Sequence, residues 1–383
     1  MKKTGINMEG VKKQNRSLIL HTINRMGPMS RKDLASITHL TPASITMISN
    51  SLLSDGLLEE AGTVKGEDGT AGRHKILLDI NGEKHLTLTV NIEAEETTIA
   101  LCDCKGRLAG DVSVKTIKTD RKLEPELFLR RIAGICREIT EIQPEDVREK
   151  IAFLSVGISG IVDRERKISV HAYGVWDREV EVGRIMEEEL GLEVLLFNNV
   201  EALALGELLF GIGRTYDNLL LIKWGPGVGS TIVINGQIYE GRHGKSAELG
   251  HYIVDRNGRR CNCGRTGCLE TVVSYKALRE LLDFPMNAFE DAFSSTDEET
   301  KKALREKIDL FARCIVNTAT ILAPNRIVLC GKLFGGETIR KELISACQSY
   351  DKGFNERRIL YTGLSDREAY IGPAAVFTEH ILV

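Results

Sequence analysis

The sequence contains no apolar run near the roughly 18 residues that a membrane-spanning helix needs. Its first residues, MKKTGINMEGVKK, carry lysines without an apolar core behind them, so a secretory signal is not expected. These absences predict a cytoplasmic protein with no membrane partner. Nine cysteines in a cytosolic chain of 383 residues argue against a disulfide framework, so a tight cysteine cluster would first indicate a metal or redox site.

A strong net charge is also missing, since 51 lysines and arginines face 54 acids. The balance is uneven, however. Residues 1–80 carry 11 basic and 8 acidic side chains, which leaves 40 against 46 in the rest. Mild positive charge confined to one terminal segment fits a modest nucleic-acid footprint. The length, with 42% hydrophobic residues, predicts two or three globular domains.

The first eighty residues have the pattern of three short helices followed by a β-hairpin. A glycine-proline pair at 27–28 ends the first helix, and Ser30 can cap a second. Thr41, followed by proline, caps a third helix that runs to about Leu53. Two helices joined by a tight turn, with a hairpin behind them, predict a winged helix-turn-helix whose third helix enters the major groove of DNA.

The third helix presents a small, hydroxyl-rich face that suits base edges and phosphates. The expected DNA contacts on the helices are Arg31, Thr41, Ala43, Ser44, Thr46, Met47 and Asn50. On the hairpin wing they are Arg73, His74 and Lys75, at a basic tip. The alternative is a helical cap or dimerisation module that does not touch DNA.

A cluster of metal-binding side chains lies in the segment ELGHYIVDRNGRRCNCGRTGCLE. Its potential ligands are His251, Cys261, Cys263 and Cys268. One imidazole and three thiolates form a tetrahedral zinc set, and four protein ligands leave no open position for water, so the predicted Zn²⁺ is structural. Unrelated free thiols are the alternative. The other six cysteines lie in apolar runs and are expected to be small core residues.

From residue 84 onward the chain resembles the ROK family of sugar kinases and sugar-responsive repressors, and with the helical segment in front it resembles the repressor branch. The most specific motifs are SAELGH (246–251) and CNCGRTGCLE (261–270). The others are LTLTVNIEAEETTIALCDCKGRL (86–108), VGISGIVD (156–163), FNNVEALALGE (197–207) and WGPGVGSTIVINGQIYEG (224–241).

The resemblance implies an α/β fold: a winged helix-turn-helix at 1–80 followed by a two-lobed, actin-like (ribonuclease-H-type) sugar-kinase fold. The first lobe would span 81–197 and be completed by about 362–383, and the second lobe, with the zinc motif, would span 198–361.

The catalytic side of the kinase site departs from the family. The family uses an aspartate as general base where this chain has Asn199, and an amide cannot accept a proton near neutral pH. The family's first phosphate hairpin has an aspartate, two glycines and a threonine where this chain has Asn91, Glu93, Ala94 and Glu95. Side chains there would block and repel phosphate. The glycine-rich turn LCGKLFGG is kept only in part, so we expect no catalytic residue and no phosphoryl transfer.

The sugar side is better preserved. By resemblance, the ligand-binding residues are Gly160, Asn198, Asn199, Glu248, His251 and Glu270. Zinc bound to one nitrogen of His251 would aim the other ring N–H at the ligand. Alternatively, Glu248 and Glu270 only orient the zinc ligands, and Asn198 only caps the following helix.

Two further positions leave two interpretations each. Glu201, where the family usually has asparagine, either faces solvent on the first turn of a helix or adjusts sugar selectivity. Trp176 either stacks on a sugar face or packs in the core.

Together these patterns predict a sugar-responsive repressor, active as a homodimer or homotetramer, that binds operator DNA and a small sugar effector. One alternative is an active sugar kinase with a regulatory DNA-binding arm. Another is a repressor with a vestigial cleft that is controlled by a protein partner. Neither the sugar nor the operator can be identified from the sequence.

Overall fold

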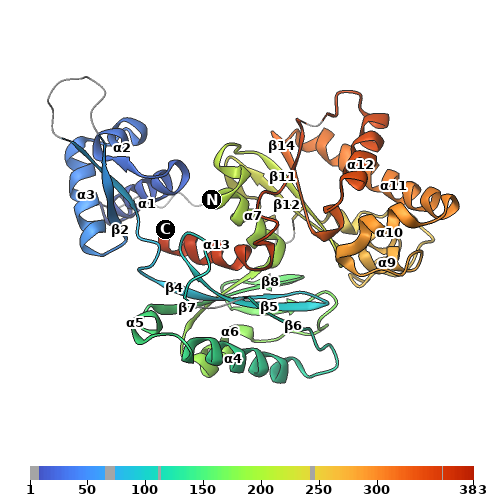
Figure 1. Cartoon of the computed structure of the whole chain (residues 1–383), viewed down its shortest axis with the longest axis horizontal. Coiled ribbons are helices and arrows are strands. Elements are labelled where there is room, and N and C mark those ends of the chain that lie inside the picture. Colours follow the sequence, from blue (N-terminus) through green and yellow to red (C-terminus); the bar gives the residue numbers. More distant parts are fainter. Residues whose placement is uncertain (1–7, 65–73, 111–113, 242–245, 356) are drawn as a thin grey trace.

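The computed structural model describes residues 8–64, 74–110, 114–241, 246–355 and 357–383 (Figure 1). Its first unit is a winged helix, which we call the reading head. The elements of the reading head are α1 (Met8–Met26), β1 (Met29–Ser30), α2 (Arg31–Thr38), α3 (Pro42–Ser54), β2 (Leu58–Val64) and β3 (Lys75–Ile80). The three strands form an antiparallel sheet in the order β1-β3-β2.

The predicted caps of the reading head are present. Ser30 caps α2 in a reciprocal capping box with Asp33, and Thr41 Oγ1 accepts a hydrogen bond from the backbone N–H of Ser44. These bonds satisfy amides that the first turn of each helix leaves without a partner. The starts of α2 and α3 are therefore fixed by side chains that the sequence already identifies.

Two five-stranded sheets form the rest of the molecule. The first sheet has the order β10-β7-β4-β5-β6 and the second the order β13-β12-β11-β14-β15. The first contains β4 (Leu86–Ile92), β5 (Glu96–Asp103), β6 (Lys115–Lys118), β7 (Ile151–Ile158) and β10 (Glu193–Asn198). The second contains β11 (Leu219–Trp224), β12 (Val228–Ile234), β13 (Gln237–Ile238), β14 (Arg326–Cys330) and β15 (Ile359–Tyr361).

The two sheets have the same topology. Each begins with a three-strand antiparallel meander, and two more strands are then added in parallel beside the first strand of the meander. This duplication confirms the two-lobed kinase-like fold expected from the resemblance. A separate hairpin of β8 (Ile161–Asp163) and β9 (Ile168–His171) extends from the first sheet.

Helices cover the outer faces of both sheets. Those on the first sheet are α4 (Pro125–Glu141), α5 (Glu145–Arg148) and α6 (Val182–Leu190). Those on the second are α8 (Glu270–Val273), α9 (Tyr275–Arg279), α10 (Phe289–Ser295), α11 (Glu298–Leu322) and α12 (Glu337–Tyr350). Within the described ranges, no helix is long and apolar enough to cross a membrane.

Two further helices, α7 (Asn199–Phe210) and α13 (Glu368–Leu382), lie between the sheets and pack on each other (Figure 1). Leu203 and Ala204 of α7 contact the core of the second sheet, whereas Leu205 and Leu209 belong to the core of the reading head. A helix that is apolar on all sides is typically buried, and this is the position of α7. It contacts the reading head, the first sheet and the second sheet.

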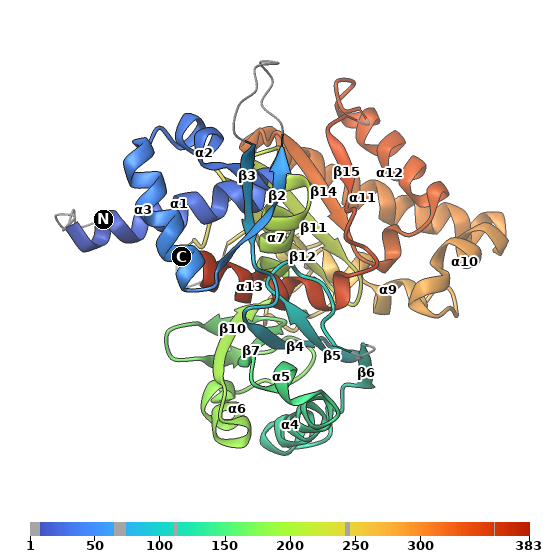
Figure 2. The same ribbon diagram turned by 60° about the vertical axis from the view of Figure 1, so that its left-hand side comes forward.

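The reading head is docked on the C-terminal end of α7 (Figure 2). Asn24 of α1 donates a 3.1 Å hydrogen bond to the Leu209 carbonyl, one of those that the last turn of a helix leaves without an intrahelical partner. Arg25 and Arg214 each donate to the other's backbone carbonyl at 2.8 Å, and Arg25 also pairs with Asp217 at 3.0 Å. The junction thus combines a shared apolar core with polar contacts at its rim.

Candidate functional site

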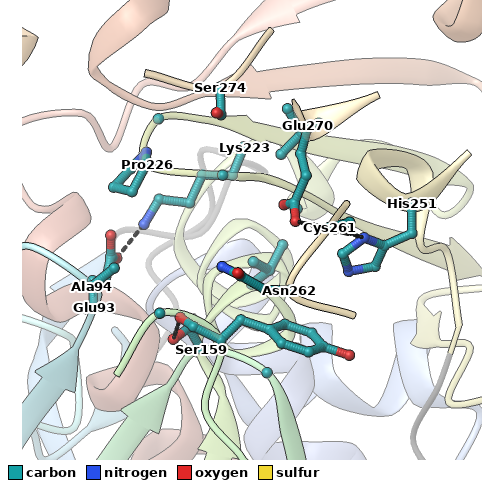
Figure 3. A pocket seen from close by; sticks show the side chains of 18 of the residues that line it. Glu93, Ala94, Ser159, Lys223, Pro226, His251, Cys261, Asn262, Glu270 and Ser274 are labelled. Atoms are coloured by element: carbon teal, nitrogen blue, oxygen red, sulfur yellow. Dashed lines mark hydrogen bonds and ion pairs between the residues drawn. The ribbon is translucent and has the colours of Figure 1, made fainter. Parts of the chain in front are cut away.

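A cleft of about 330 Å³ opens between the two sheets (Figure 3). It is lined by the turn between β4 and β5, the N-terminus of α7, the turn between β11 and β12, and the segment from 246 to 280. All six predicted ligand-binding residues lie on its wall, namely Gly160, Asn198, Asn199, Glu248, His251 and Glu270. The fold therefore brings together residues that lie 110 positions apart in the sequence.

Gly160 and Asn198 shape the floor of the cleft. Gly160 has φ +97°, and a Cβ there would lie 2.1 Å from the His171 carbonyl oxygen, so only glycine fits. Asn198 is the N-cap of α7: its Oδ1 accepts from the backbone N–H groups of Val200 at 2.8 Å and Glu201 at 3.1 Å. Its Nδ2 donates to the Gly160 carbonyl at 2.7 Å. Asn198 thus caps α7, as one of the two interpretations expected. Its amide has a second N–H that a ligand could accept from, so contact with a sugar stays a prediction.

Asn199, which the resemblance places at the position of the family's base, is buried and bonded to an acid. Its Nδ2 donates to Glu93 Oε1 at 3.3 Å. The same oxygen accepts from Asn91 Nδ2 at 3.0 Å and from the Lys223 ammonium group. Three donors from three elements, β4, α7 and β11, therefore converge on one carboxylate oxygen at the end of the cleft opposite His251 (Figure 3).

The ion pair at this end of the cleft includes a second carboxylate. Lys223 Nζ lies 3.5 Å from Glu368 Oε1, and Glu368 Oε2 accepts from the backbone N–H of Gly331 at 3.0 Å. Burial by itself would raise the pKa of Glu93, but Lys223 and the amides hold that pKa below its usual value. Burial would lower the pKa of Lys223, yet the two carboxylates raise it. Both shifts favour the charged forms of Glu93 and Lys223.

The neighbouring acid of the turn, Glu95, is also paired. Its carboxylate binds the Arg121 guanidinium, which donates as well to the Ala94 carbonyl at 2.8 Å. We expected the acids of this turn to repel phosphate by their charge. Cations of the same chain pair with both carboxylates, so their charge is partly compensated, and the exclusion of phosphate by this turn stays a prediction.

The predicted metal ligands meet at the other end of the cleft. The ligand atoms of His251, Cys261, Cys263 and Cys268 all lie within 4.8 Å of one another. The Sγ atoms of Cys263 and Cys268 are 3.6 Å apart, as are His251 Nδ1 and Cys261 Sγ. Tetrahedral zinc with Zn–S bonds near 2.3 Å separates its ligands by roughly 3.5–4 Å, so the donor set fits a zinc ion in type and spacing.

The conformation of the metal loop also fits this role. Gly267 has φ +74°, and a Cβ there would lie 1.5 Å from the Asp255 carbonyl oxygen, so the loop can close tightly only with glycine. Burial raises the pKa of the Cys261 and Cys268 thiols, which a bound divalent cation would counteract by stabilising the thiolates. When bound, the metal would supply folding energy to an irregular segment.

The acids beside the cluster contact its ligands. Glu270 Oε1 lies 3.0 Å from Cys261 Sγ and 3.7 Å from His251 Nδ1. Glu248 Oε2 lies 3.4 Å from His251 Nε2, so the second ring nitrogen faces Glu248. Both acids are therefore placed to orient the metal ligands and still line the cleft, and the two interpretations are compatible.

The structure decides between the alternatives for two residues. Glu201 is only 8% exposed and pairs with Arg164 at 2.6 Å, so the solvent-facing alternative is wrong. Burial raises the pKa of Glu201 against the opposing effect of Arg164. Trp176 is 8% exposed, and its Nε1 donates to Ser169 Oγ at 3.0 Å, so it packs in the core and is unavailable for stacking on a sugar. Tyr173 lines the cleft instead, with its ring 5.3 Å from that of His251.

The residues expected to bind DNA lie mainly on one exposed face of the reading head. Ala43, Thr46, Met47 and Asn50 of α3 are exposed, and Met47 reaches 61% exposure. Arg31 of α2 donates to Asn50 Oδ1 at 3.0 Å, so the two helices present a connected surface.

Two of the three residues predicted on the hairpin wing are described. His74 is exposed, and Lys75 begins β3 with its Nζ 3.7 Å from Asp33 Oδ1, so their contact with DNA stays a prediction. Arg73 lies outside the described residues.

Several residues with little solvent exposure lie outside the motifs. The six cysteines outside the cluster are all buried, as expected: Cys102, Cys104, Cys136, Cys314, Cys330 and Cys347. Lys223 was missed by the sequence analysis, although a lysine in the apolar strand LLLIKW is an unusual residue for a buried position. Its partner Glu93 lies 130 residues away in the chain, so the pair itself could not be read from the sequence.

Comparison with known proteins agrees with this architecture. A family model described as ROK family matches residues 87–380. The chain is 24% identical to the xylose repressor of Bacillus subtilis (strain 168) over 97% of both chains. It is 28% identical to the DNA-binding transcriptional dual regulator NagC of Escherichia coli (strain K12), over 89% of this chain and 86% of NagC.

Among solved structures, a ROK family transcriptional regulator described as a homolog of the E. coli MLC protein is similar over 97% of this chain and 98% of its own. The TM-score is 0.76 and the sequence identity is 23%. The chain therefore belongs to the ROK family, and over its full length it resembles the transcriptional regulators of that family.

Proposed function

We propose that the protein is a sugar-responsive transcriptional repressor that binds operator DNA through its winged helix and a sugar in its cleft, without phosphorylating the sugar. In this proposal residues 1–80 bind DNA. The first lobe comprises residues 81–197 with about 362–383, and the second comprises 198–361. Two copies would place their α3 helices in successive major grooves of a two-fold operator.

The observation that carries the proposal is the state of Asn199. A kinase needs a carboxylate base beside the reacting hydroxyl and a clamp for the nucleotide phosphates. Here an amide stands at the base position, and its Nδ2 donates to Glu93, which fills the phosphate end. Binding without phosphoryl transfer is what such a cleft would retain, and the curated relatives named above are transcriptional regulators.

The other end of the cleft suits a hydroxylated ligand. Glu248, His251 and Glu270 gather carboxylates and an imidazole on one wall, and Asn198 retains a free amide N–H on the floor. Carboxylates accept hydrogen bonds from sugar hydroxyls, and buried polar groups reject ligands that lack them. A structural Zn²⁺ held by the His251 cluster would fix this wall.

Helix α7 offers a route from the ligand to the DNA. Its N-terminal residues 198–201 line the cleft, and its C-terminal carbonyl at Leu209 is bound by Asn24 of the reading head. A shift of the two lobes on sugar binding would move this helix as a rigid body. The separation of the paired reading heads would then change, and with it the affinity for the operator.

The DNA-binding part of the proposal is tested on the DNA upstream of the protein's own gene and its neighbours. Wild-type protein should shift such a fragment specifically, and Thr46→Ala with Asn50→Ala should weaken specific binding by about 1–3 kcal/mol for each base that is no longer recognised. Lys302→Ala, on the exposed face of α11 far from the reading head, is the matched control. Absence of sequence-specific binding under every condition would contradict the proposal.

Other experimental results would support the two alternative functions. Turnover in a coupled phosphotransfer assay with a sugar panel would indicate a kinase with a regulatory arm. DNA binding that persists while calorimetry detects no sugar would indicate control by a protein partner.

A further inference from the structure

We propose that Glu93 is a built-in anion that occupies a phosphate-type anion site formed by Lys223, Asn91 and Asn199. This site lies at the end of the cleft opposite the predicted sugar-binding residues, and its donors do not depend on the identity of the effector. The same contact joins the first sheet to the second, so the chain's own carboxylate stands where a soluble anion would otherwise have to bridge them.

The donor set is that of an anion site. Lys223 contributes an ammonium group, and Asn91 and Asn199 contribute amide N–H groups at 3.0 and 3.3 Å from one oxygen of Glu93. All three point donors at this oxygen, from β4, α7 and β11. Convergent N–H groups around one cation are the usual means of holding a phosphate or carboxylate oxygen.

The site is accessible from the cleft if Glu93 is removed. Glu93 and Lys223 line the cleft near Pro226 (Figure 3), and Asn199, Gly225 and Gly227 line it as well. The side chains of Glu93 and Lys223 are 20% and 12% exposed, so the pair is largely desolvated but borders the open space. A small anion entering the cleft would thus meet the same donors.

The site is also built to keep its cation in place. Glu368 lies 3.5 Å from Lys223 Nζ, and the backbone N–H of Gly331 anchors its other oxygen at 3.0 Å. Removal of Glu93 therefore leaves Lys223 charged and positioned by Glu368. Because Glu368 still partly neutralises Lys223, we expect only a moderate gain in anion affinity when Glu93 is removed.

The contact spans the cleft. Glu93 belongs to the turn after β4 of the first sheet, whereas Lys223 lies on β11 of the second. Glu96 and Lys332 also bridge the two sides at 3.1 Å, but both are about half exposed, and solvent weakens such a pair. In a largely buried pair, loss of one partner costs more than in an exposed pair, so Glu93–Lys223 is the stronger of these two connections.

The test is a gain of function measured by calorimetry with tripolyphosphate. Glu93→Ala should bind this probe at least about tenfold more tightly than the wild type, which corresponds to ~1.4 kcal/mol. Adding Lys223→Met should abolish the gain. Glu188→Ala, which removes an acid paired with exposed Arg184 away from the cleft, is the matched control and should gain nothing. Equal binding by wild type and Glu93→Ala, a gain with Glu188→Ala, or a gain that survives Lys223→Met would each overturn the proposal.

A second measurement keeps the proposal testable if Glu93→Ala fails to fold. Thermal unfolding is compared for Glu93→Gln, Lys223→Met and the double variant, all of which keep the side-chain volume nearly constant. The double variant should unfold at a higher temperature than Lys223→Met alone, because it no longer buries the Glu93 charge without its cation. Additive losses would show that the two residues act independently and would contradict the inference.

Discussion

At the scale of single residues, two substitutions that the resemblance places in a kinase-type site contact each other. The Asn199 side chain is an amide, which cannot accept a proton near neutral pH, and it is one of the donors that hold Glu93 at the end of the cleft opposite His251. We therefore expect that restoring one of these residues does not restore a catalytic arrangement. The sequence showed both substitutions, but not that they contact each other, because the contact forms only where the turn after β4 approaches the N-terminus of α7.

Asn199→Asp is expected to yield no phosphorylation of any sugar in a panel, measured by coupled release of ADP. The new carboxylate would face Glu93, and loss of the amide donor beside a buried acid should lower the free energy of unfolding by about 1–3 kcal/mol. Turnover above that of the wild type would contradict this account. Unchanged stability would show that the Asn199–Glu93 bond is unimportant.

Metal analysis should find about one zinc per chain, given four protein ligands around one position. Cys263→Ser should lose most of this zinc and unfold at a lower temperature, because metal binding contributes to the folding of the loop. Cys347→Ala removes a buried thiol outside the cluster and should keep its zinc. A zinc-free wild type that remains well folded would refute the assignment.

At the scale of elements, the features predicted best from the sequence are those that depend on residues close together in the chain. The caps at Ser30 and Thr41 and the spacing of the cysteines depend on residues close together in the chain, so the reading head and the metal loop were predictable. Pairs such as Arg164 with Glu201 depend on the approach of distant segments. The resemblance predicted six residues that line the cleft, but not how other acids of the cleft are paired with cations.

The cap of α7 gives a prediction at this scale. Asn198→Ala removes the acceptor for two backbone N–H groups and the donor to Gly160, and should lower the free energy of unfolding by about 1–2 kcal/mol in denaturant titrations. Asn198→Ser restores a capping oxygen without the bond to Gly160, so it should recover part of the loss. An alanine variant as stable as the wild type would mean that the cap contributes nothing.

At the scale of the whole molecule, the same helix meets the cleft at one end and the reading head at the other. The junction buries apolar side chains of α1, α7 and α13 in one core and adds the polar contacts of Asn24 and Arg25. The docking of the reading head on α7 could not be predicted from the sequence, since its contacts join residues about 190 positions apart, such as Arg25 and Asp217.

The double variant Asn24→Ala with Arg25→Ala should uncouple ligand binding in the cleft from DNA binding by the reading head. Effector affinity and basal DNA affinity should stay close to those of the wild type, whereas the coupling between them, ordinarily about 1–3 kcal/mol in such regulators, should fall. Gln14→Ala, on an exposed part of the same helix, is the control. Binding of both ligands is measured separately and together, and undiminished coupling in the double variant would rule out this route.

The central claim is that the cleft senses a ligand and the reading head reports it on DNA. Its most direct test is a titration of upstream DNA by fluorescence anisotropy at one fixed salt concentration, with and without each member of a sugar panel. The account predicts specific binding at least about 10³-fold tighter than binding to unrelated DNA, altered by one class of sugar that is recovered unphosphorylated. Specific binding unaffected by every sugar, or a sugar recovered as its phosphate, would contradict it.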